Sequence, residues 1–105
     1  MADSVRTAAG PSGMPRLRRR VYYSGRVQGV GFRYTCLWLA RGFEVGGHVR
    51  NLPDGRVELV AEGEETDLDG FLSAIEREMA VYIKGVVLET ESPEGGPLSG
   101  FVIHH

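Results

Sequence analysis

The sequence predicts an α+β sandwich, in which an antiparallel β-sheet is covered on one face by two α-helices. Two segments repeat apolar residues at the spacing of a helix face, and the segments around them are rich in β-branched and aromatic residues. Their order is β-α-β-β-α-β, followed by a short C-terminal strand. Packing both helices on one face of the sheet is the economical arrangement of this order, which is called ferredoxin-like. That fold hosts many functions, so the function must come from particular residues.

Residues 21–43 are predicted to form a strand, a loop and a helix. The run 21–24 is β-branched and aromatic and predicts the first strand. The glycine-rich segment 25–31 predicts a loop. A helix is predicted over residues 32–43, because its apolar residues share one helix face: Phe32, Cys36, Leu39 and Phe43.

The next two strands form a predicted hairpin. Residues 48–52 and 56–62 flank Pro53-Asp54-Gly55, a sequence typical of a tight turn. The segment 56–62 begins with alternating polar and apolar residues, which indicates that one face of the sheet is exposed to water. If the first two strands were neighbours in the sheet, Asn51 would lie near the glycine loop.

The last third of the chain contains a second helix and two strands. Thr66 followed by Asp69 resembles a capping box and predicts that the helix covers about 66–79. Strands are then predicted at 83–90 and 101–103. The acidic residues Glu62, Glu64 and Glu65 are interpreted as a solvated turn before the helix.

Length, composition and charge narrow the class of protein. The chain has 105 residues, 42% hydrophobic and 25% charged, as expected for one globular domain. Residues 1–15 contain almost no large apolar groups and predict a disordered leader, so the domain is expected to cover 16–105. No run of apolar residues suits a membrane span or a signal peptide, and the single cysteine excludes an internal disulfide. A cytoplasmic protein without a membrane partner is therefore expected.

The basic residues are concentrated at the start of the chain. Residues 1–20 contain five arginines and one aspartate, which leaves the rest of the chain with a net charge of −6. An acidic domain disfavours nucleic-acid binding, so no nucleic-acid partner is expected. The cluster Arg16–Arg20 is interpreted as a solvated basic lead-in to the domain rather than as a tether.

The loop Gly25-Arg26-Val27-Gln28-Gly29-Val30-Gly31 enters the first helix directly, and Arg33 lies in the first helical turn. Backbone N–H groups at such a junction favour an anion, and the Arg33 guanidinium can bind two phosphate oxygens at once. The spacing alone is equally consistent with a simple strand-to-helix turn and a solvated arginine. Neither a P-loop nor a dinucleotide fingerprint is present, because no Gly-Lys-Ser/Thr follows and position 34 is Tyr.

Two motifs together resemble the signatures of the acylphosphatase family. The first is Gly25-Arg26-Val27-Gln28-Gly29-Val30-Gly31-Phe32-Arg33, and the second is Gly47-His48-Val49-Arg50-Asn51-Leu52-Pro53-Asp54-Gly55-Arg56-Val57, reaching Gly63. They occur in the family's order and with its separation, and the similarity extends from about Val21 to Ile103. His48 departs from the pattern, since relatives usually have an aromatic such as Trp there. Glu44 departs as well, since relatives usually have Gly.

The resemblance implies a metal-free, cofactor-free enzyme that hydrolyses acyl phosphates. It implies that Arg33 binds the phosphate, that Asn51 orients the attacking water, and that a cradle of backbone N–H groups holds the phosphoryl oxygens. The cradle would comprise Gln28, Gly29, Val30, Gly31 and Phe32. The partner is a small-molecule acyl phosphate, with inorganic phosphate or sulfate as product or competing ligand, and the protein is expected to be a monomer.

Two other functions remain open at this point. A non-catalytic phosphate-binding or regulatory module could keep the cradle, but it would have no need of Asn51. An RNA-binding domain of the same fold is disfavoured by the acidic charge and by adjacent Tyr22 and Tyr23, which point to opposite faces of a strand. His104 and His105 are interpreted as solvated, Trp38 as a half-exposed packing residue, and Cys36 as a buried, unreactive thiol.

Overall fold

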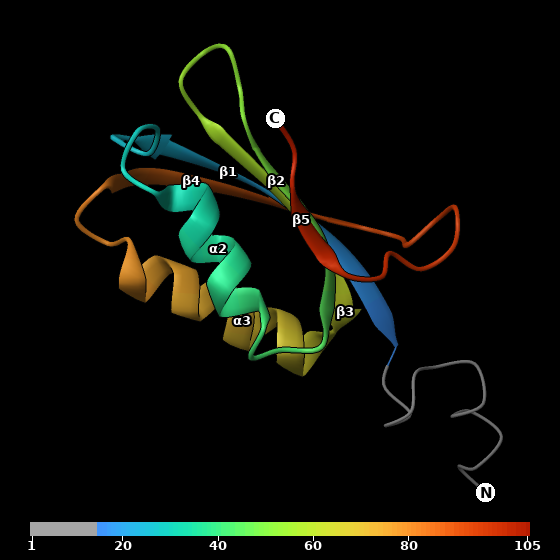
Figure 1. Ribbon diagram of the computed structural model, residues 1–105. Coiled ribbons are helices and arrows are strands. Elements are labelled where there is room, and N and C mark those ends of the chain that lie inside the picture. Colours follow the sequence, from blue (N-terminus) through green and yellow to red (C-terminus); the bar gives the residue numbers. More distant parts are fainter. Residues whose placement is uncertain (1–14) are drawn as a thin grey trace, which may run out of the picture.

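The computed structural model describes residues 15–105, and the predicted order of helices and strands is confirmed (Figure 1). The predicted disordered leader lies, up to residue 14, outside the described residues. None of the helices described is long and apolar enough to cross a membrane. The elements are β1 (Arg16–Gly25), α2 (Phe32–Ala40), β2 (Val45–Asn51), β3 (Val57–Glu64), α3 (Glu65–Glu78), β4 (Ile83–Glu91) and β5 (Phe101–Ile103).

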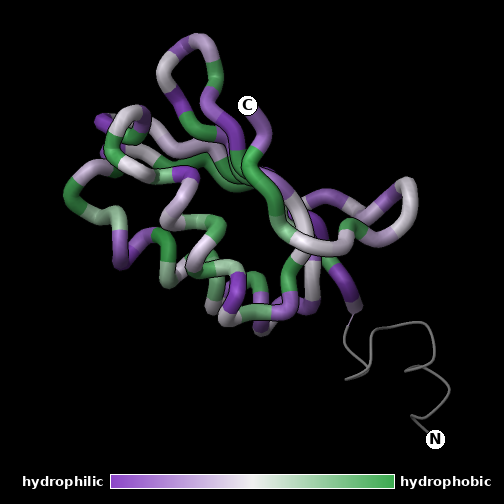
Figure 2. Tube along the Cα trace, viewed as in Figure 1, coloured by the Kyte–Doolittle hydropathy of each residue, from purple (hydrophilic) through white to green (hydrophobic). Residues whose placement is uncertain are grey.

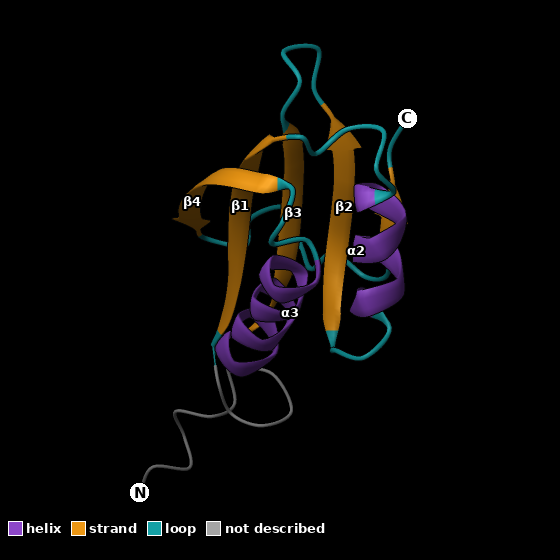
Figure 3. Ribbon diagram, turned by 90° about the vertical axis from the view of Figure 1, so that its left-hand side faces the viewer, coloured by secondary structure: helices purple, strands orange, loops and turns teal. Residues whose placement is uncertain are grey.

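The five strands form one sheet in the order β4-β1-β3-β2-β5. The first four strands pair antiparallel, as predicted, whereas β5 pairs parallel with β2, so the complete sheet is mixed. The expected contact between the first two strands is wrong, because β3 lies between β1 and β2 (Figure 3). Both strands run antiparallel to β3 and therefore parallel to each other. Their C-terminal ends meet at one edge of the sheet, where Val57 pairs with Tyr23 on one side and with Asn51 on the other.

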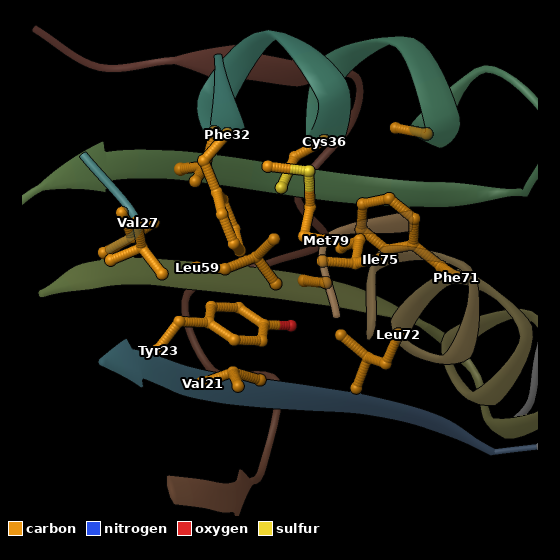
Figure 4. Close-up of a cluster of buried hydrophobic side chains, with 14 of the residues drawn as sticks. Val21, Tyr23, Val27, Phe32, Cys36, Leu59, Phe71, Leu72, Ile75 and Met79 are labelled. Atoms are coloured by element: carbon orange, nitrogen blue, oxygen red, sulfur yellow. The ribbon is translucent and has the colours of Figure 1, made fainter. Parts of the chain in front are cut away.

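Both helices cover the same face of the sheet, and the hydrophobic core lies between the two layers (Figures 2 and 4). Tyr23 of β1 packs its ring against Phe32 at the start of α2, with ring centroids 5.0 Å apart. Phe71 of α3 packs edge-to-face on Phe101 of β5, at 5.3 Å. These aromatic contacts bury large apolar areas and fix both helices on the sheet. The start of α2, which carries Arg33, is therefore anchored by its neighbour Phe32.

Both helices differ from their predicted boundaries for local reasons. Helix α2 ends at Ala40 because the next residues form tighter turns, in which the Gly42 and Phe43 N–H groups bond to carbonyls three residues back. Helix α3 begins at Glu65 with Glu64 at the N-cap position. Thr66 therefore lies inside the first turn, and the predicted capping box does not form.

The sheet face opposite the helices carries a network of ion pairs, and the prediction that β3 has a wet face is wrong. Glu58 and Glu62 of β3 are only 3% and 1% exposed. Arg20 and Arg50 bond to Glu58 at 2.9 and 2.6 Å, and Arg18 bonds to Glu62 at 2.8 Å. Burial alone would raise the pKa of Glu58, but the bonds from Arg50 and Arg20 outweigh burial and lower it. Both glutamates thus form ion pairs with arginines of neighbouring strands. Glu62 therefore does not belong to the predicted solvated turn.

The basic cluster at the start of the domain is part of the sheet. The expected solvated lead-in 16–20 forms the first half of β1, which begins five residues before the predicted strand. Its side chains alternate between the two faces: Arg18 and Arg20 bond to the β3 glutamates, whereas Arg19 bonds to Asp69 of α3. The arginines therefore belong in a strand because their partners lie on elements that follow much later in the chain.

His48 stacks on His104 at the same open face, with ring centroids 4.3 Å apart and planes 12° apart. Burial lowers the pKa of His48 below its usual 6.5, and the neighbouring His104 lowers it further. The folded state therefore binds this proton more weakly than the unfolded state does. The protein is therefore most stable, with respect to this group, above about pH 6.5, where His48 is neutral in both states. The free energy of unfolding falls as the pH decreases from there toward the folded-state pKa, because the unfolded state binds the proton first.

We expect the free energy of unfolding to decline less between about pH 7 and pH 5.5 in His48→Phe than in the wild type. The phenyl ring can keep the stacking contact but binds no proton. Urea titrations at a series of pH values measure the effect, with the exposed His105 replaced by Phe as the control. Parallel pH profiles for wild type and His48→Phe would assign the acid sensitivity to other groups.

Candidate active site

The loop between β1 and α2 is fixed at both ends by backbone hydrogen bonds. The Arg26 N–H donates to the Tyr82 carbonyl at 2.9 Å, and the Gly31 carbonyl accepts from both the N–H and the hydroxyl of Thr35. Gly29 and Gly31 have φ values of 78° and 80°, the left-handed region that favours glycine. A side chain at either position would meet no atom within 4 Å, so the space beside the loop is open to a ligand.

Gln28 fastens this loop to the hairpin between β2 and β3. Its side-chain Nε2 donates to the Leu52 carbonyl at 2.8 Å and to the Arg56 carbonyl at 2.9 Å. Leu52 directly follows Asn51, so the bond ties the loop to the chain at the end of β2. The predicted role of Gln28 in the cradle concerns its backbone N–H, and its side chain holds the hairpin.

The loop, the start of α2 and the end of β2 enclose a cavity of about 190 Å³. Arg33 and Asn51, the two residues with predicted catalytic roles, line it together. Of the predicted cradle, Gly29, Gly31 and Phe32 line the cavity, whereas Gln28 and Val30 do not. Val30 instead packs against the hydrophobic core. The residues that line the cavity are Val27, Gly29, Gly31, Phe32, Arg33, Tyr34 and Asn51.

Val27 and Tyr34 were not among the predicted site residues. Val27 is completely buried and forms an apolar wall. Tyr34 follows Arg33 on a helix whose successive side chains are about 100° apart, so it borders the cavity from the adjacent side. This adjacency in the helix is the signal in the sequence that could have identified it.

Arg33 is available to an anion because no acidic side chain of the described residues forms an ion pair with it. Within residues 15–105 it is the one partly buried cation that forms no ion pair. The other unpaired cations described are exposed: Arg26, Arg41, Arg77 and Lys84. The first turn of α2 also contains no acidic residue, so the partial positive charge of the helix N-terminus is not offset by a carboxylate there. The cavity wall is therefore electropositive and suited to bind an anion.

Other reactive groups lie away from the cavity. Cys36 is fully buried, and burial raises the pKa of its thiol, as the predicted unreactive cysteine requires. The imidazoles of His48 and His104 stack on the opposite sheet face. No cluster of three or more His, Cys, Asp or Glu side chains in the part of the chain that the structure describes could hold a metal ion.

We expect Gln28→Ala to lower the free energy of unfolding by about 1–3 kcal/mol, because two carbonyl groups lose a partly buried donor. Loosening of the hairpin should also move Asn51 relative to the loop. Chemical denaturation measures the loss of stability. The displacement of Asn51 should appear as a lower kcat for the reaction that the cavity catalyses.

Gln28→Glu is the sharper variant of the same test. It keeps the shape of the side chain but places a carboxylate oxygen against the two carbonyl oxygens. It should therefore be at least as destabilising as alanine. If Gln28→Glu were as stable as the wild type, the two hydrogen bonds would not hold the loop to the hairpin.

Comparison with known proteins finds one family model and several relatives that match this chain over part or most of its length. A family model described as Acylphosphatase matches residues 19–103. The acylphosphatase of Thermococcus kodakarensis is 41% identical over 91 residues, which cover 86% of this chain and 98% of that protein. The acylphosphatase of Archaeoglobus fulgidus is 58% identical over 55 residues, covering 52% of this chain and 62% of that protein. The solved acylphosphatase from Bacillus subtilis superposes with a TM-score of 0.75 at 33% identity, over 85% of this chain and 99% of that one.

Proposed function

The chain belongs to the acylphosphatase family, and on that premise we propose that it hydrolyses acyl phosphates to a carboxylate and inorganic phosphate in the cavity between α2 and β2. The observation that carries the proposal is that Arg33, partly buried and without an ion pair within residues 15–105, lines one cavity with Asn51. A negatively charged phosphoryl group in this cavity would pair with the Arg33 guanidinium.

The phosphoryl oxygens would be held by Arg33 and by backbone N–H groups between Gln28 and Phe32. A guanidinium can donate two parallel hydrogen bonds to a phosphate, which fixes its orientation as well as its position. The open space beside Gly29 and Gly31 leaves room for the ligand to approach the main chain. These donors would bind more strongly as charge shifts to the phosphoryl oxygens in the transition state, which is how they would accelerate the reaction.

Asn51 would hold the attacking water. Its amide cannot act as a base at neutral pH, but it offers both a donor and an acceptor to a water molecule. Its side chain forms no hydrogen bond within residues 15–105 that would occupy these groups. In the reaction the water oxygen bonds to phosphorus while the anhydride P–O bond breaks, and the bonding electrons leave with the carboxylate. A phosphoryl oxygen of the substrate takes the proton of the water.

This reaction needs little further catalytic help. The leaving carboxylate is a weak base, so no general acid is required at the anhydride oxygen. Phosphoryl transfer depends mainly on positioning and charge stabilisation, which Arg33, Asn51 and the loop would supply without a metal or cofactor. We further propose that the domain, residues 16–105, acts as a monomer in the cytoplasm; one chain provides every group named, so the mechanism requires no second copy.

The test is hydrolysis of benzoyl phosphate, followed by ultraviolet absorbance against the spontaneous rate in buffer. We expect turnover that EDTA does not reduce and that inorganic phosphate or sulfate inhibits competitively. Activity lost in EDTA and restored by a divalent ion would contradict the metal-free mechanism. Phosphate binding without turnover would instead support the alternative function, a non-catalytic phosphate-binding module.

A further inference from the structure

We infer that Tyr34 forms the binding surface for the acyl group and makes the enzyme prefer acyl phosphates with an aromatic or bulky apolar acyl group. This inference rests on the proposed function. It adds a specificity-determining residue to the site and names the class of substrate.

The position of Tyr34 connects the phosphate cavity to solvent. Tyr34 lines the cavity together with Arg33 and Asn51, and yet it is 68% exposed. A side chain that both lines a cavity and remains largely exposed lies at its mouth. An acyl phosphate held by its phosphoryl end must pass its other end through this mouth, because the cavity of about 190 Å³ is closed on its inner side by the buried Val27 and Phe32.

The direction of the reaction also places the acyl group near α2. In-line displacement requires the attacking water and the leaving carboxylate to lie on opposite sides of phosphorus. Asn51 lines the cavity from β2, and Tyr34 lines it from α2. Water held on the β2 wall would therefore direct the leaving group toward the wall that carries Tyr34.

The ring of Tyr34 is free to receive an acyl group. Among the residues described, it packs on no other aromatic ring, and its hydroxyl forms no hydrogen bond. An aromatic face prefers an aromatic or apolar partner in offset or edge-to-face contact. A methyl group, as in acetyl phosphate, covers little of the ring, whereas a phenyl group, as in benzoyl phosphate, covers much more.

Trp38 provides a matched control on the same helix. It lies one turn after Tyr34 and is 66% exposed, nearly the same fraction. It does not line the phosphate cavity but borders a separate groove with Arg41 and Arg77. Replacing Trp38 therefore removes an equally exposed aromatic ring from α2 without changing the mouth of the site.

The experiment compares kcat/KM for benzoyl phosphate and acetyl phosphate in the wild type, Tyr34→Ala, Tyr34→Phe and Trp38→Ala. In Tyr34→Ala we expect the ratio of benzoyl to acetyl phosphate to fall by about three- to tenfold, the range for one aromatic contact. Tyr34→Phe and Trp38→Ala should keep the wild-type ratio. The inhibition constant of inorganic phosphate should stay the same in all four proteins, because the phosphoryl group is proposed to bind Arg33 and the loop, and only the acyl group to contact the ring.

The outcomes separate this inference from the proposed function. If the wild type hydrolysed neither substrate, the proposed function and this inference would both be overturned. If the wild type were active and Tyr34→Ala kept its ratio, only the role of Tyr34 would be overturned. An equal loss in Trp38→Ala, or weaker phosphate inhibition in Tyr34→Ala, would also overturn it, since the effect would then come from the helix or the cradle.

Discussion

Arg33→Ala should lower kcat/KM for an acyl phosphate by about 10³-fold or more, the usual effect of removing an arginine that stabilises phosphoryl transfer. It should also abolish inhibition by inorganic phosphate at concentrations that inhibit the wild type. Arg33 is the partly buried cation in the cavity without an acidic partner among residues 15–105, so its loss leaves the phosphoryl charge to the backbone alone. Steady-state kinetics with benzoyl phosphate measure the rate, and phosphate titration measures the binding.

Two further variants show whether the shape or only the charge of Arg33 matters. Arg33→Lys keeps the charge but loses the planar pair of donors, so we expect partial phosphate affinity with most of the turnover lost. Arg41 lies at the C-terminal end of α2, is exposed, and forms no ion pair with any residue that the structure describes. Arg41→Ala removes an equal charge from the same helix and should retain wild-type kinetics. An undiminished rate in Arg33→Ala would remove this residue from the mechanism.

Asn51→Ala should separate binding from turnover. We expect kcat to fall by about 10²-fold or more, because a water molecule is no longer held in line with the scissile bond. The inhibition constant of inorganic phosphate should change little, since Arg33 and the loop remain. Measuring kcat with benzoyl phosphate beside phosphate inhibition in the same variant tests both halves of this expectation.

Asn51→Asp is the informative companion to the alanine variant. The carboxylate has nearly the shape of the amide but places a negative charge in the cavity that holds the phosphoryl group. We expect it to weaken phosphate binding, which alanine would not do. If Asn51→Ala lost phosphate affinity and turnover equally, together with stability in urea, Asn51 would be a structural residue at the end of β2.

Local patterns in the sequence were sufficient to predict the elements but not their neighbours. The periodic apolar residues located both helices to within a few residues, and the hairpin turn at 53–55 was recognised from its chemistry. The position of β3 between β1 and β2 could not be read in this way, because strand order depends on contacts between distant segments. The prediction placed Asn51 near the loop for a wrong reason, and the true reason is the shared edge of two parallel strands.

Burial on the open sheet face was misjudged for a related reason. Glu58 and Glu62 look solvated in the sequence because isolated carboxylates are rarely buried. Their partners Arg18 and Arg20 lie about forty residues earlier in the chain, in a segment whose composition resembles a flexible basic lead-in. Charge complementarity between β1 and β3 becomes visible only when their pairing is known.

The insertion of β3 between β1 and β2 has a consequence for how the enzyme matures. Arg33 follows β1 and Asn51 ends β2, but both strands are held in place by hydrogen bonds to β3, which is made later and ends at Glu64. A nascent chain that has just exposed both residues thus still lacks the strand that sets their separation. Catalysis must wait for the middle of the sheet to close, and non-local closure of this kind is the slow part of folding. A partly folded chain in which β3 has not yet paired with β1 and β2 should therefore not hydrolyse acyl phosphates.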